Sequence, residues 1–518
     1  MLATLDLSIV FIYGVSLLAL AQWVSREKVG HEKNANDYFL ASKSLPWWAI
    51  GTSLVAANIS AEQIIGMSGS GYAIGLAIAS YEWMGAITLI LVGKYLLPVF
   101  LKVGIYTMPQ FLEHRFDHRV RMVMALFWLG VYVFVNLTSI LWLGALAINT
   151  ITGLDLFYGL TFLGLFALAY SLYGGLKAVA LTDIIQVVLL MLGGVLIAWI
   201  LLQQVSDGQG VLAGFITLME QAPEKFDMIL SRDSPHYASL PGISVLIGGM
   251  WIMNLSYWGF NQYIIQRALA AKSVDEAQKG IALAAFLKLL MPIIVVLPGI
   301  AMFVLNSELT SPDQAYPHAM MLLPTGIKGL VFAALLAAIV SSLASMTNSI
   351  STIFTMDVYR HLIPNAREEK SVLVGRLASI SAMLIAIVIA RPLLGNFDQA
   401  FQYIQEFTGF FTPGIVVIFL LGIFYSRTTA EAALAAGVGS AVLSLAFKLA
   451  LPDLPFIDRV GLVFLLCTVL ALIISHLWPR HQDKVIDLAG ISTETTSSFN
   501  LSALLIILIL AGLYVTWW

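Results

Sequence analysis

Residues 51–76 read GTSLVAANISAEQIIGMSGSGYAIGL, and this stretch decides the fold class. It is apolar enough to enter a membrane, yet Asn58, Ser60, Glu62 and Gln63 lie in its middle, among glycines. Polar side chains are costly in hydrocarbon unless they find partners, so they usually face a cavity or the interior of a helix bundle. A hydrophobic segment interrupted by glycine and polar residues also marks the binding site of many secondary transporters. The alternative is a kinked helix whose polar groups only bond to neighbouring helices.

The composition is that of a polytopic membrane protein. Of the 518 residues 59% are hydrophobic and 11% are charged, whereas a soluble protein would be about 25% charged. The net charge of −3 gives no reason to expect a nucleic-acid partner. The single cysteine, Cys467, lies in an apolar run, which excludes intrachain disulfides and disfavours a thiolate metal site. Residues 1–24 lack a basic n-region and a small-residue cleavage site, so we expect a retained first span rather than a signal peptide.

Apolar segments of about 20 residues, the length that crosses a bilayer, recur along the whole chain. We predict fourteen transmembrane helices, at 5–24, 46–70, 77–102, 121–148, 156–174, 178–203, 241–266, 277–306, 326–356, 371–392, 397–425, 430–450, 457–478 and 500–518. No linker is long enough for a soluble domain, so we expect an all-α protein with one membrane domain, 1–518. It needs a lipid bilayer around it.

The distribution of basic residues predicts the orientation in the membrane. Loops after the odd-numbered spans carry most of the Lys and Arg, and such loops stay in the cytoplasm. Both termini should therefore lie outside, where the acidic loop 204–240 also fits. Residues 105–119, IYTMPQFLEHRFDHR, are expected to form a short cytoplasmic helix. His114 and His118 in it have the i, i+4 spacing of metal ligands, but in so basic a loop we expect a solvated face instead.

A weak internal repeat is visible. Asn58-Ile59-Ser60 followed by Gln63 resembles Asn254-Leu255-Ser256 followed by Gln262. The two segments begin groups of five spans, and groups of an odd number have opposite topology, as in the inverted repeats of many transporters. We therefore divide the chain into an extra N-terminal helix with its cytoplasmic loop, a first repeat, a second repeat and three extra C-terminal helices, at 1–45, 46–203, 241–425 and 426–518.

Further polar side chains at membrane depth gather in four other spans. They are Tyr81, Glu82, Asn254, Tyr257, Trp258, Asn261, Gln262, Lys288, Gln402, Gln405 and Glu406. An isolated cation such as Lys288 needs an acidic or carbonyl partner, for which Glu82 and Glu406 are candidates. Amides, a carboxylate, an ammonium group and aromatic rings together suit a neutral polyhydroxylated ligand, although each residue alone is as well explained by a structural hydrogen bond. No catalytic triad or phosphate loop is present, so we expect neither an enzyme nor an organic cofactor.

A sodium site is a separate hypothesis. The run ALLAAIVSSLASMTNS within 326–356 is rich in small residues and carries Ser341 and Ser342. Sodium is a hard cation that prefers oxygen ligands, which these hydroxyls and freed carbonyls near Ala56 and Ile59 would supply. Close helix packing explains the small residues equally well.

Five long blocks carry a family resemblance. They are SLVAANISAEQIIGMSGSGYAIGLAIASYEWM (53–84), YSLYGGLKAV (170–179), YWGFNQYIIQRALAAKSVDEAQKG (257–280), AAIVSSLASM (337–346) and AFQYIQEFTG (400–409). With these blocks the chain resembles the sodium/solute symporter family over essentially its full length, in the group of bacterial sodium/galactose symporters and animal sodium/glucose cotransporters. The resemblance implies a LeuT-like fold of two inverted five-helix repeats, with one extra N-terminal and three extra C-terminal helices, in a bacterial inner membrane with periplasmic termini.

The resemblance also implies site residues. The sugar would bind Gln63, Glu82, Asn254, Lys288 and Gln405. The gates would consist of Met67, Tyr81 and Phe401 on the outer side, Tyr257 with Asn58 bonded to its hydroxyl on the inner side, and Trp258. Sodium would be held by the carbonyls of Ala56, Ile59 and Ala338 and by the hydroxyls of Ser341 and Ser342, and it would leave past Asp183.

The function implied is sodium-driven import of a monosaccharide, galactose or glucose, by alternating access. Two positions depart from the sodium/galactose symporters: Gly85 replaces a serine that contacts the sugar, and Ser256 replaces a tyrosine beside the gate. One lost hydroxyl contact is worth roughly 1 kcal/mol, enough to change the ranking of sugars. The alternative is a symporter of the same fold for another neutral solute such as myo-inositol; a sialic acid fits Glu82 poorly. A channel would need a continuous polar stripe, and a sensor would usually add a soluble output domain.

Overall fold

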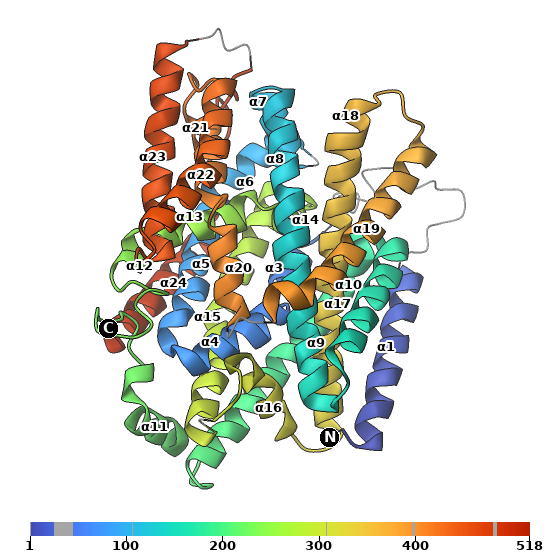
Figure 1. Ribbon diagram of the computed structural model, residues 1–518, viewed down its shortest axis with the longest axis vertical. Coiled ribbons are helices and arrows are strands. Elements are labelled where there is room, and N and C mark those ends of the chain that lie inside the picture. Colours follow the sequence, from blue (N-terminus) through green and yellow to red (C-terminus); the bar gives the residue numbers. More distant parts are fainter. Residues whose placement is uncertain (1, 25–44, 106, 307, 396–398, 480–483) are drawn as a thin grey trace.

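The computed structural model describes residues 2–24, 45–105, 107–306, 308–395, 399–479 and 484–518, without the side chains of residues 18, 21, 22, 24, 172–183 and 368. Within this part the chain is helical and contains no strand, apart from one isolated bridge between Leu45 and Ala271. The predicted all-α class is confirmed (Figure 1).

The first half of the chain forms α1 (Thr4–Val24), α3 (Trp47–Asn58), α4 (Met67–Ala73), α5 (Ser80–Leu91), α6 (Leu97–Val103), α7 (Met108–Arg115), α8 (His118–Val131), α9 (Thr138–Thr152), α10 (Leu156–Val205) and α11 (Val211–Gln221). The second half forms α12 (Ser244–Ile247), α13 (Gly249–Leu255), α14 (Gln262–Leu269), α15 (Val274–Leu305), α16 (Ala315–Met321), α17 (Ile327–Ile353), α18 (Arg360–Leu362), α19 (Glu368–Leu394), α20 (Ala400–Thr408), α21 (Thr412–Phe424), α22 (Ala430–Ala450), α23 (Phe456–Leu477) and α24 (Ser497–Thr516). Short turns of π-helix or 3₁₀-helix join several of them: η2 (Glu62–Gly66), η3 (Leu76–Ala79), η4 (Val92–Leu96), η5 (Tyr132–Leu137), η6 (Pro223–Lys225), η7 (Ser256–Phe260), η8 (Pro312–Gln314) and η9 (Phe354–Tyr359).

Nine helices in the described residues are long and apolar enough to cross a bilayer, and α20 with α21, bent by 45°, would make a tenth. Helices occupy each of the fourteen predicted ranges. The helices around 46–70 and 241–266 are broken into shorter pieces. For α1 and the first half of α10 the count covers only the described side chains up to Leu17 and Ser171. The predicted spans 156–174 and 178–203 lie in one helix, α10, which was not expected. The side chains of residues 172–183, which include the junction of these two predicted spans, lie outside the described residues.

Two helical segments are broken at the positions where polar residues interrupt the sequence. After α3 the backbone of Ile59 leaves the helical conformation, and η2 begins three residues later. After α13 comes η7, and Asn261 is extended before α14 begins. Both breaks release backbone groups from the helical ladder, and transporters tolerate such groups where they line a cavity.

The molecule has two opposite ends, which we call the α7 face and the α11 face (Figure 1). At the α7 face the buried Arg115 donates to the carbonyls of Gly422 and Tyr425 at 2.7 and 3.1 Å, which ties α7 to the end of α21. Burial lowers the pKa of Arg115 to about 10, so it stays charged at neutral pH. The helix predicted within 105–119 is thus confirmed.

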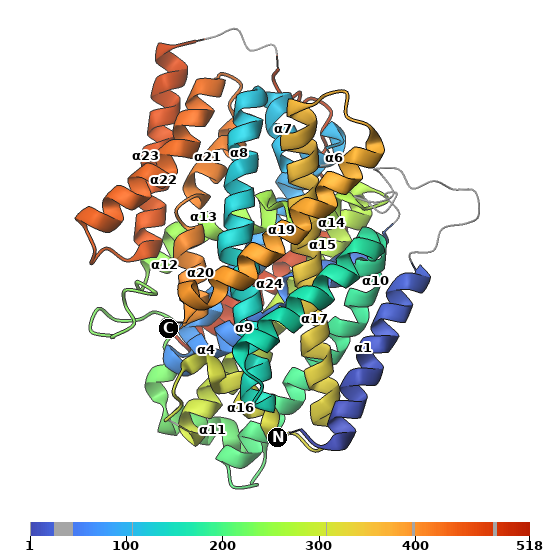
Figure 2. The ribbon, with the colours of Figure 1, turned by 45° about the vertical axis from the view of Figure 1, so that its right-hand side comes forward.

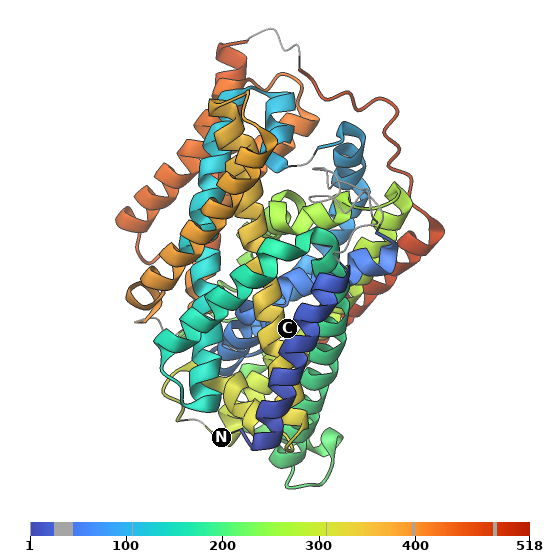
Figure 3. The same cartoon turned by 90° about the vertical axis from the view of Figure 1, so that its right-hand side faces the viewer.

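The two ends of the chain both join the α11 side. Near the N-terminus Asp6 accepts bonds from the amides of Gly326 and Gly329 at 2.7 and 3.0 Å, which caps α17, and α1 packs along α17 (Figure 3). At the other end the backbone of Met228, in the loop after α11, donates to the carbonyl of Trp517 at 2.9 Å. Figure 2 shows α22 and α23 at the periphery, and their many exposed apolar side chains suit contact with lipid.

Candidate functional site

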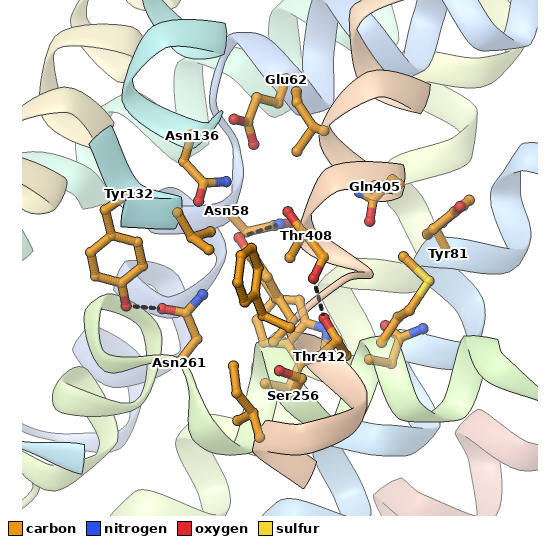
Figure 4. Close-up of a pocket in the computed structure, with 18 of the residues that line it drawn as sticks. Asn58, Glu62, Tyr81, Tyr132, Asn136, Ser256, Asn261, Gln405, Thr408 and Thr412 are labelled. Carbon is orange, nitrogen blue, oxygen red and sulfur yellow. Dashed lines mark hydrogen bonds between the residues drawn. The ribbon is translucent and has the colours of Figure 1, made fainter. Parts of the chain in front are cut away.

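A cavity lies between the two broken segments, in the middle of the bundle (Figure 4). Its walls come from the end of α3 and from η2, α5, α8, η5, α13, η7, α15, α20 and α21. The polar residues that line it are Asn58, Glu62, Gln63, Tyr81, Glu82, Tyr132, Asn136, Asn254, Ser256, Tyr257, Trp258, Asn261, Lys288, Gln405, Thr408 and Thr412.

A buried polar network runs through this cavity. The Lys288 ammonium donates to the Glu82 carboxylate and to the side-chain oxygen of Asn58, and the Gln63 amide donates to the other oxygen of Glu82. Lys288 and Glu82 are each 1% exposed. A buried ion pair is tolerated only when further hydrogen bonds satisfy both partners, and Asn58 and Gln63 do this here. The Lys288 ammonium also lies 4.9 Å from the centre of the Trp258 ring.

The network continues to a pair of tyrosines. Asn58 donates its amide proton to the Tyr257 hydroxyl at 3.1 Å, and this hydroxyl lies 2.7 Å from that of Tyr263. Asn58 ends α3, whereas Tyr257 and Tyr263 belong to η7 and α14. Hydrogen bonds therefore join the two broken segments directly, and one of the residues involved, Asn58, also bonds to Lys288 of the ion pair.

Two aromatic side chains, Tyr81 and Phe401, line the side of the cavity toward the α11 face. The rings of Tyr81 and Phe401 meet edge to face, 5.1 Å apart, and Met67 is fully buried. On the side toward the α7 face, the lining continues to Trp128 of α8 and Ile415 of α21. The resemblance assigns Met67, Tyr81 and Phe401 to the outer gate. Tyr81 and Phe401 do lie together, whereas Met67 is not among the residues that line the cavity; the gating role stays a prediction.

The proposed sodium ligands come from α3 and α17, which are in contact. The amide of Ser60 bonds to the carbonyl of Asn58 at 2.8 Å instead of reaching back to Ala56, as it would in a continuous helix. Ser341 and Ser342 are buried on α17, and the Ser342 hydroxyl has no hydrogen-bond partner. Beside them, buried Arg267 donates to Ser53 of α3 and Ser345 of α17, each at 2.9 Å. The Arg267 guanidinium is itself a cation and supplies no ligand, but the Ser341 and Ser342 hydroxyls and the Ala56 carbonyl are oxygen groups, the ligand type that a small hard cation prefers.

Some predicted contacts are absent. Glu406, one candidate partner of Lys288, instead bonds to Lys448 and Arg459 at 2.8 and 3.1 Å, because it points to the opposite side of α20. Gln262 accepts a bond from the Met108 amide at 2.8 Å and so holds α7 rather than facing the cavity. Asp183 lies among the side chains outside the described residues.

The cavity also contains polar residues to which no role was given. Glu62 lies beside Asn136, and one of its carboxylate oxygens is buried without a partner (Figure 4). Tyr132 donates to Asn261 at 2.5 Å on the same wall. Asn136 and Tyr132 lie in η5, inside a long apolar run. Because that run reads as an ordinary span, only a search for single amides at membrane depth would have found them.

Gly85 lies against the wall of the cavity. A side chain there would bring its Cβ within 2.9 Å of the Trp258 indole nitrogen and 3.0 Å of the Asn254 side-chain oxygen. Glycine lets these two groups approach α5 closely, and a larger residue would have to displace them.

Broken helices that surround a mid-depth polar cavity define the class as a secondary transporter. Two solved transporters share the fold. A sodium-coupled sialic acid symporter in a substrate-bound outward-open state has a TM-score of 0.81 at 25% identity, covering 93% of this chain and 99% of that one. The nucleobase-cation-symport-1 family transporter Mhp1 has a TM-score of 0.57 at 14% identity, covering 87% and 98%, and shows the fold alone. The predicted LeuT-like architecture is confirmed; the division into repeats stays a prediction.

The chain belongs to the sodium:solute symporter family, whose model matches residues 38–439. It is a multi-pass integral membrane protein. It is 51% identical to a sodium/glucose cotransporter of Vibrio parahaemolyticus, with 100% of this chain and 99% of the relative covered. It is 32% identical to sodium/myo-inositol cotransporter 2 of Mus musculus, with 83% and 67% covered. The family resemblance found in the sequence is confirmed.

Proposed function

We propose that this protein imports a monosaccharide, galactose or glucose, together with sodium by alternating access. The observation that carries the proposal is the buried network of Gln63, Glu82, Lys288 and Asn58 in the cavity. An amide, a carboxylate and an ammonium group offer paired donors and acceptors to hydroxyls, and Trp258 and Tyr257 offer apolar ring faces to sugar C–H groups.

Asn58 explains how sodium and sugar are coupled in this proposal. It lies between Ala56 and Ile59, whose carbonyls are proposed sodium ligands, and it bonds to both Lys288 and Tyr257. A cation held between α3 and α17 fixes the end of α3, which in turn fixes the sugar ligands and the Tyr257 gate. The ion thereby favours the state that binds sugar from outside.

The driving force is sufficient for accumulation. One charge moving through about 100 mV supplies roughly 2.3 kcal/mol, and a tenfold sodium gradient adds about 1.4 kcal/mol. At one sodium per sugar the sum supports on the order of several-hundred-fold accumulation. A measured charge-to-sugar flux ratio near two would contradict this stoichiometry.

Myo-inositol is the second candidate, because a relative named for it covers most of this chain. A cyclic polyol presents hydroxyl groups like those of a sugar, so the hydrogen-bonding groups of the cavity suit it as well. A sialic acid is disfavoured. Its carboxylate needs a cation, and Lys288, the cationic side chain among the described lining residues, is already paired with Glu82.

The test is uptake of radiolabelled galactose, glucose and myo-inositol into proteoliposomes, with sodium or potassium outside. Sodium-dependent accumulation of a hexose above equilibrium is expected. Comparing the ratio of galactose to glucose uptake between the wild type and Gly85→Ser shows how Gly85 affects the preference between the two sugars. Accumulation of myo-inositol alone would replace the substrate, and no sodium dependence for any of the three would overturn the proposal.

A further inference from the structure

A second polar pocket lies on the side of α20 that points away from the transport cavity. It lies between α20, the end of α22, the start of α23 and the loop after α11, and it is open to the outside. Figure 2 shows α20, α22 and α23 on the same side of the molecule. The lining residues that matter here are Gln402, Tyr403, Glu406, Lys448, Asp453 and Arg459.

Successive residues of a helix are 100° apart, so α20 presents two different polar faces. Phe401, Gln405 and Thr408 line the transport cavity, whereas Gln402 and Glu406 line the second pocket. One helix of nine residues therefore separates the two spaces. A helix that only packed between α22 and the rest of the bundle would not need polar residues on both of these faces. The polar residues of α20 that line the second pocket therefore point to a role beyond packing.

Part of the polar chemistry of this pocket is unsatisfied. The amide nitrogen and oxygen of Gln402 are both shielded from solvent, and neither has a hydrogen-bond partner. A buried amide without partners is costly, so a ligand that supplies a donor and an acceptor would be stabilised there. Arg459 is only 4% exposed and donates to one oxygen of Glu406, which leaves further N–H groups of the guanidinium.

The functional groups repeat those of the transport cavity. Gln402, Glu406 and Arg459 supply an amide, a carboxylate and a cation, as Gln63, Glu82 and Lys288 do, and Tyr403 and Phe456 supply rings. Glu406 balances the charge of Lys448 and Arg459 in part, and Asp453 adds a second carboxylate. A site with paired charges favours a neutral ligand rich in hydroxyls over an anion or a cation.

We propose that this pocket is a second binding site for a neutral polyhydroxylated solute, on the α11 face. That the solute is the transported sugar rests on the proposed function. Occupancy acts on α20, which carries Phe401 of the outer gate and Gln405 of the transport cavity. The site thus binds a hexose at the α11 face, the side from which the transported sugar enters. Its occupancy changes the equilibrium between the open and closed states of the outer gate.

The test is equilibrium binding of labelled galactose and glucose to the purified full chain in nanodiscs, in sodium or potassium. The wild type should bind two equivalents. Gln402→Ala and Asp453→Ala should each lose the second site and bind one equivalent, whose binding depends on sodium. Gln405→Ala should lose the sodium-dependent equivalent and keep the equivalent at the second site. Asp453 is an exposed loop residue, so its variant stays informative if Gln402→Ala fails to fold. Glu494→Gln, in an exposed loop elsewhere, is the matched control and should bind two.

One equivalent in the wild type, unchanged in Gln402→Ala and Asp453→Ala, would overturn the second site and leave the proposed function intact. A sodium-independent equivalent lost in those two variants, with no sodium-dependent binding, would support the site and overturn the proposed function. Absence of any binding would overturn both.

Discussion

The hydroxyl of Ser342 on α17 is the strongest structural support for the proposed cation site. Ser342 is 2% exposed, and its oxygen has no hydrogen-bond partner, whereas Ser349 two turns later bonds to the carbonyl of Ser345 at 3.0 Å. Buried hydroxyls are usually satisfied, and one without a partner in an oxygen-rich place is available to a cation.

Ser342→Ala is therefore expected to abolish sodium-dependent uptake, or to raise the sodium concentration for half-maximal uptake more than tenfold, without loss of expression. Sodium titration of sugar uptake in proteoliposomes measures the effect. Ser349→Ala removes a hydroxyl that is already bonded within its own helix and should leave the sodium dependence unchanged. Normal sodium activation of Ser342→Ala would remove the proposed cation site.

At the scale of the element, the tyrosine pair holds two broken segments together. Tyr257→Phe deletes the bonds to Asn58 and Tyr263, worth about 1 kcal/mol each, or roughly a 30-fold change in the gating equilibrium. We expect the inner side to open more often. The rate at which maleimide labels Ile415→Cys measures this, with little background because the only native cysteine, Cys467, is buried.

Tyr263→Phe provides the graded control for this experiment. It removes the bond between the two hydroxyls but leaves the bond from Asn58 to Tyr257, so labelling should increase by only about fivefold. Equal labelling of Ile415→Cys in the wild-type and Tyr257→Phe backgrounds would mean that Tyr257 does not gate the cavity.

The cap of α17 is a test of stability rather than transport. Asp6→Ala removes the two bonds to the amides of Gly326 and Gly329, which should cost about 1–2 kcal/mol, as for other helix N-caps. The melting temperature in detergent should fall by a few degrees. Ser8→Ala is the control, because the exposed Ser8 hydroxyl bonds only within α1, to Thr4. An unchanged melting temperature in Asp6→Ala would show that the cap adds nothing.

Elements also mark the limit of what sequence predicts. Helix ranges and the breaks at Asn58 and Asn261 are local, because hydrophobic length and polar interruption are properties of neighbouring residues. The rotation of each helix is not local. Glu406 follows Gln405 directly, yet a step of 100° places Gln405 in the cavity and Glu406 against Lys448 and Arg459. Which of the two candidate carboxylates, Glu82 or Glu406, pairs with Lys288 therefore depends on how the helices pack and could not be predicted from the sequence.

At the scale of the whole molecule, contacts divide the loops into two sets. The α7 face carries Arg115 and the loop after α23, where Lys102 donates to the carbonyl of Ala489 at 2.6 Å. The α11 face carries both chain ends and the pocket that includes Asp453. Among the described residues, Arg115, Arg119 and Arg121 lie in α7 or at the start of α8, and Lys484 donates to the carbonyl of Glu113 in α7. Because these basic residues lie at the α7 face, the positive-inside rule predicts that this face is cytoplasmic.

Two engineered cysteines test this orientation in one experiment. Asp453→Cys, on the α11 face, should react with a membrane-impermeant maleimide in intact cells, and Glu494→Cys, on the α7 face, only after the membrane is permeabilised. Buried Cys467 should stay unlabelled in both preparations and serves as the internal control. The opposite pattern would reverse the assignment of the faces, and Tyr81 with Phe401 would then close the cavity toward the cytoplasm. A symporter fold has an inner and an outer gate in either case, so this labelling decides which aromatic residues the incoming sugar meets first.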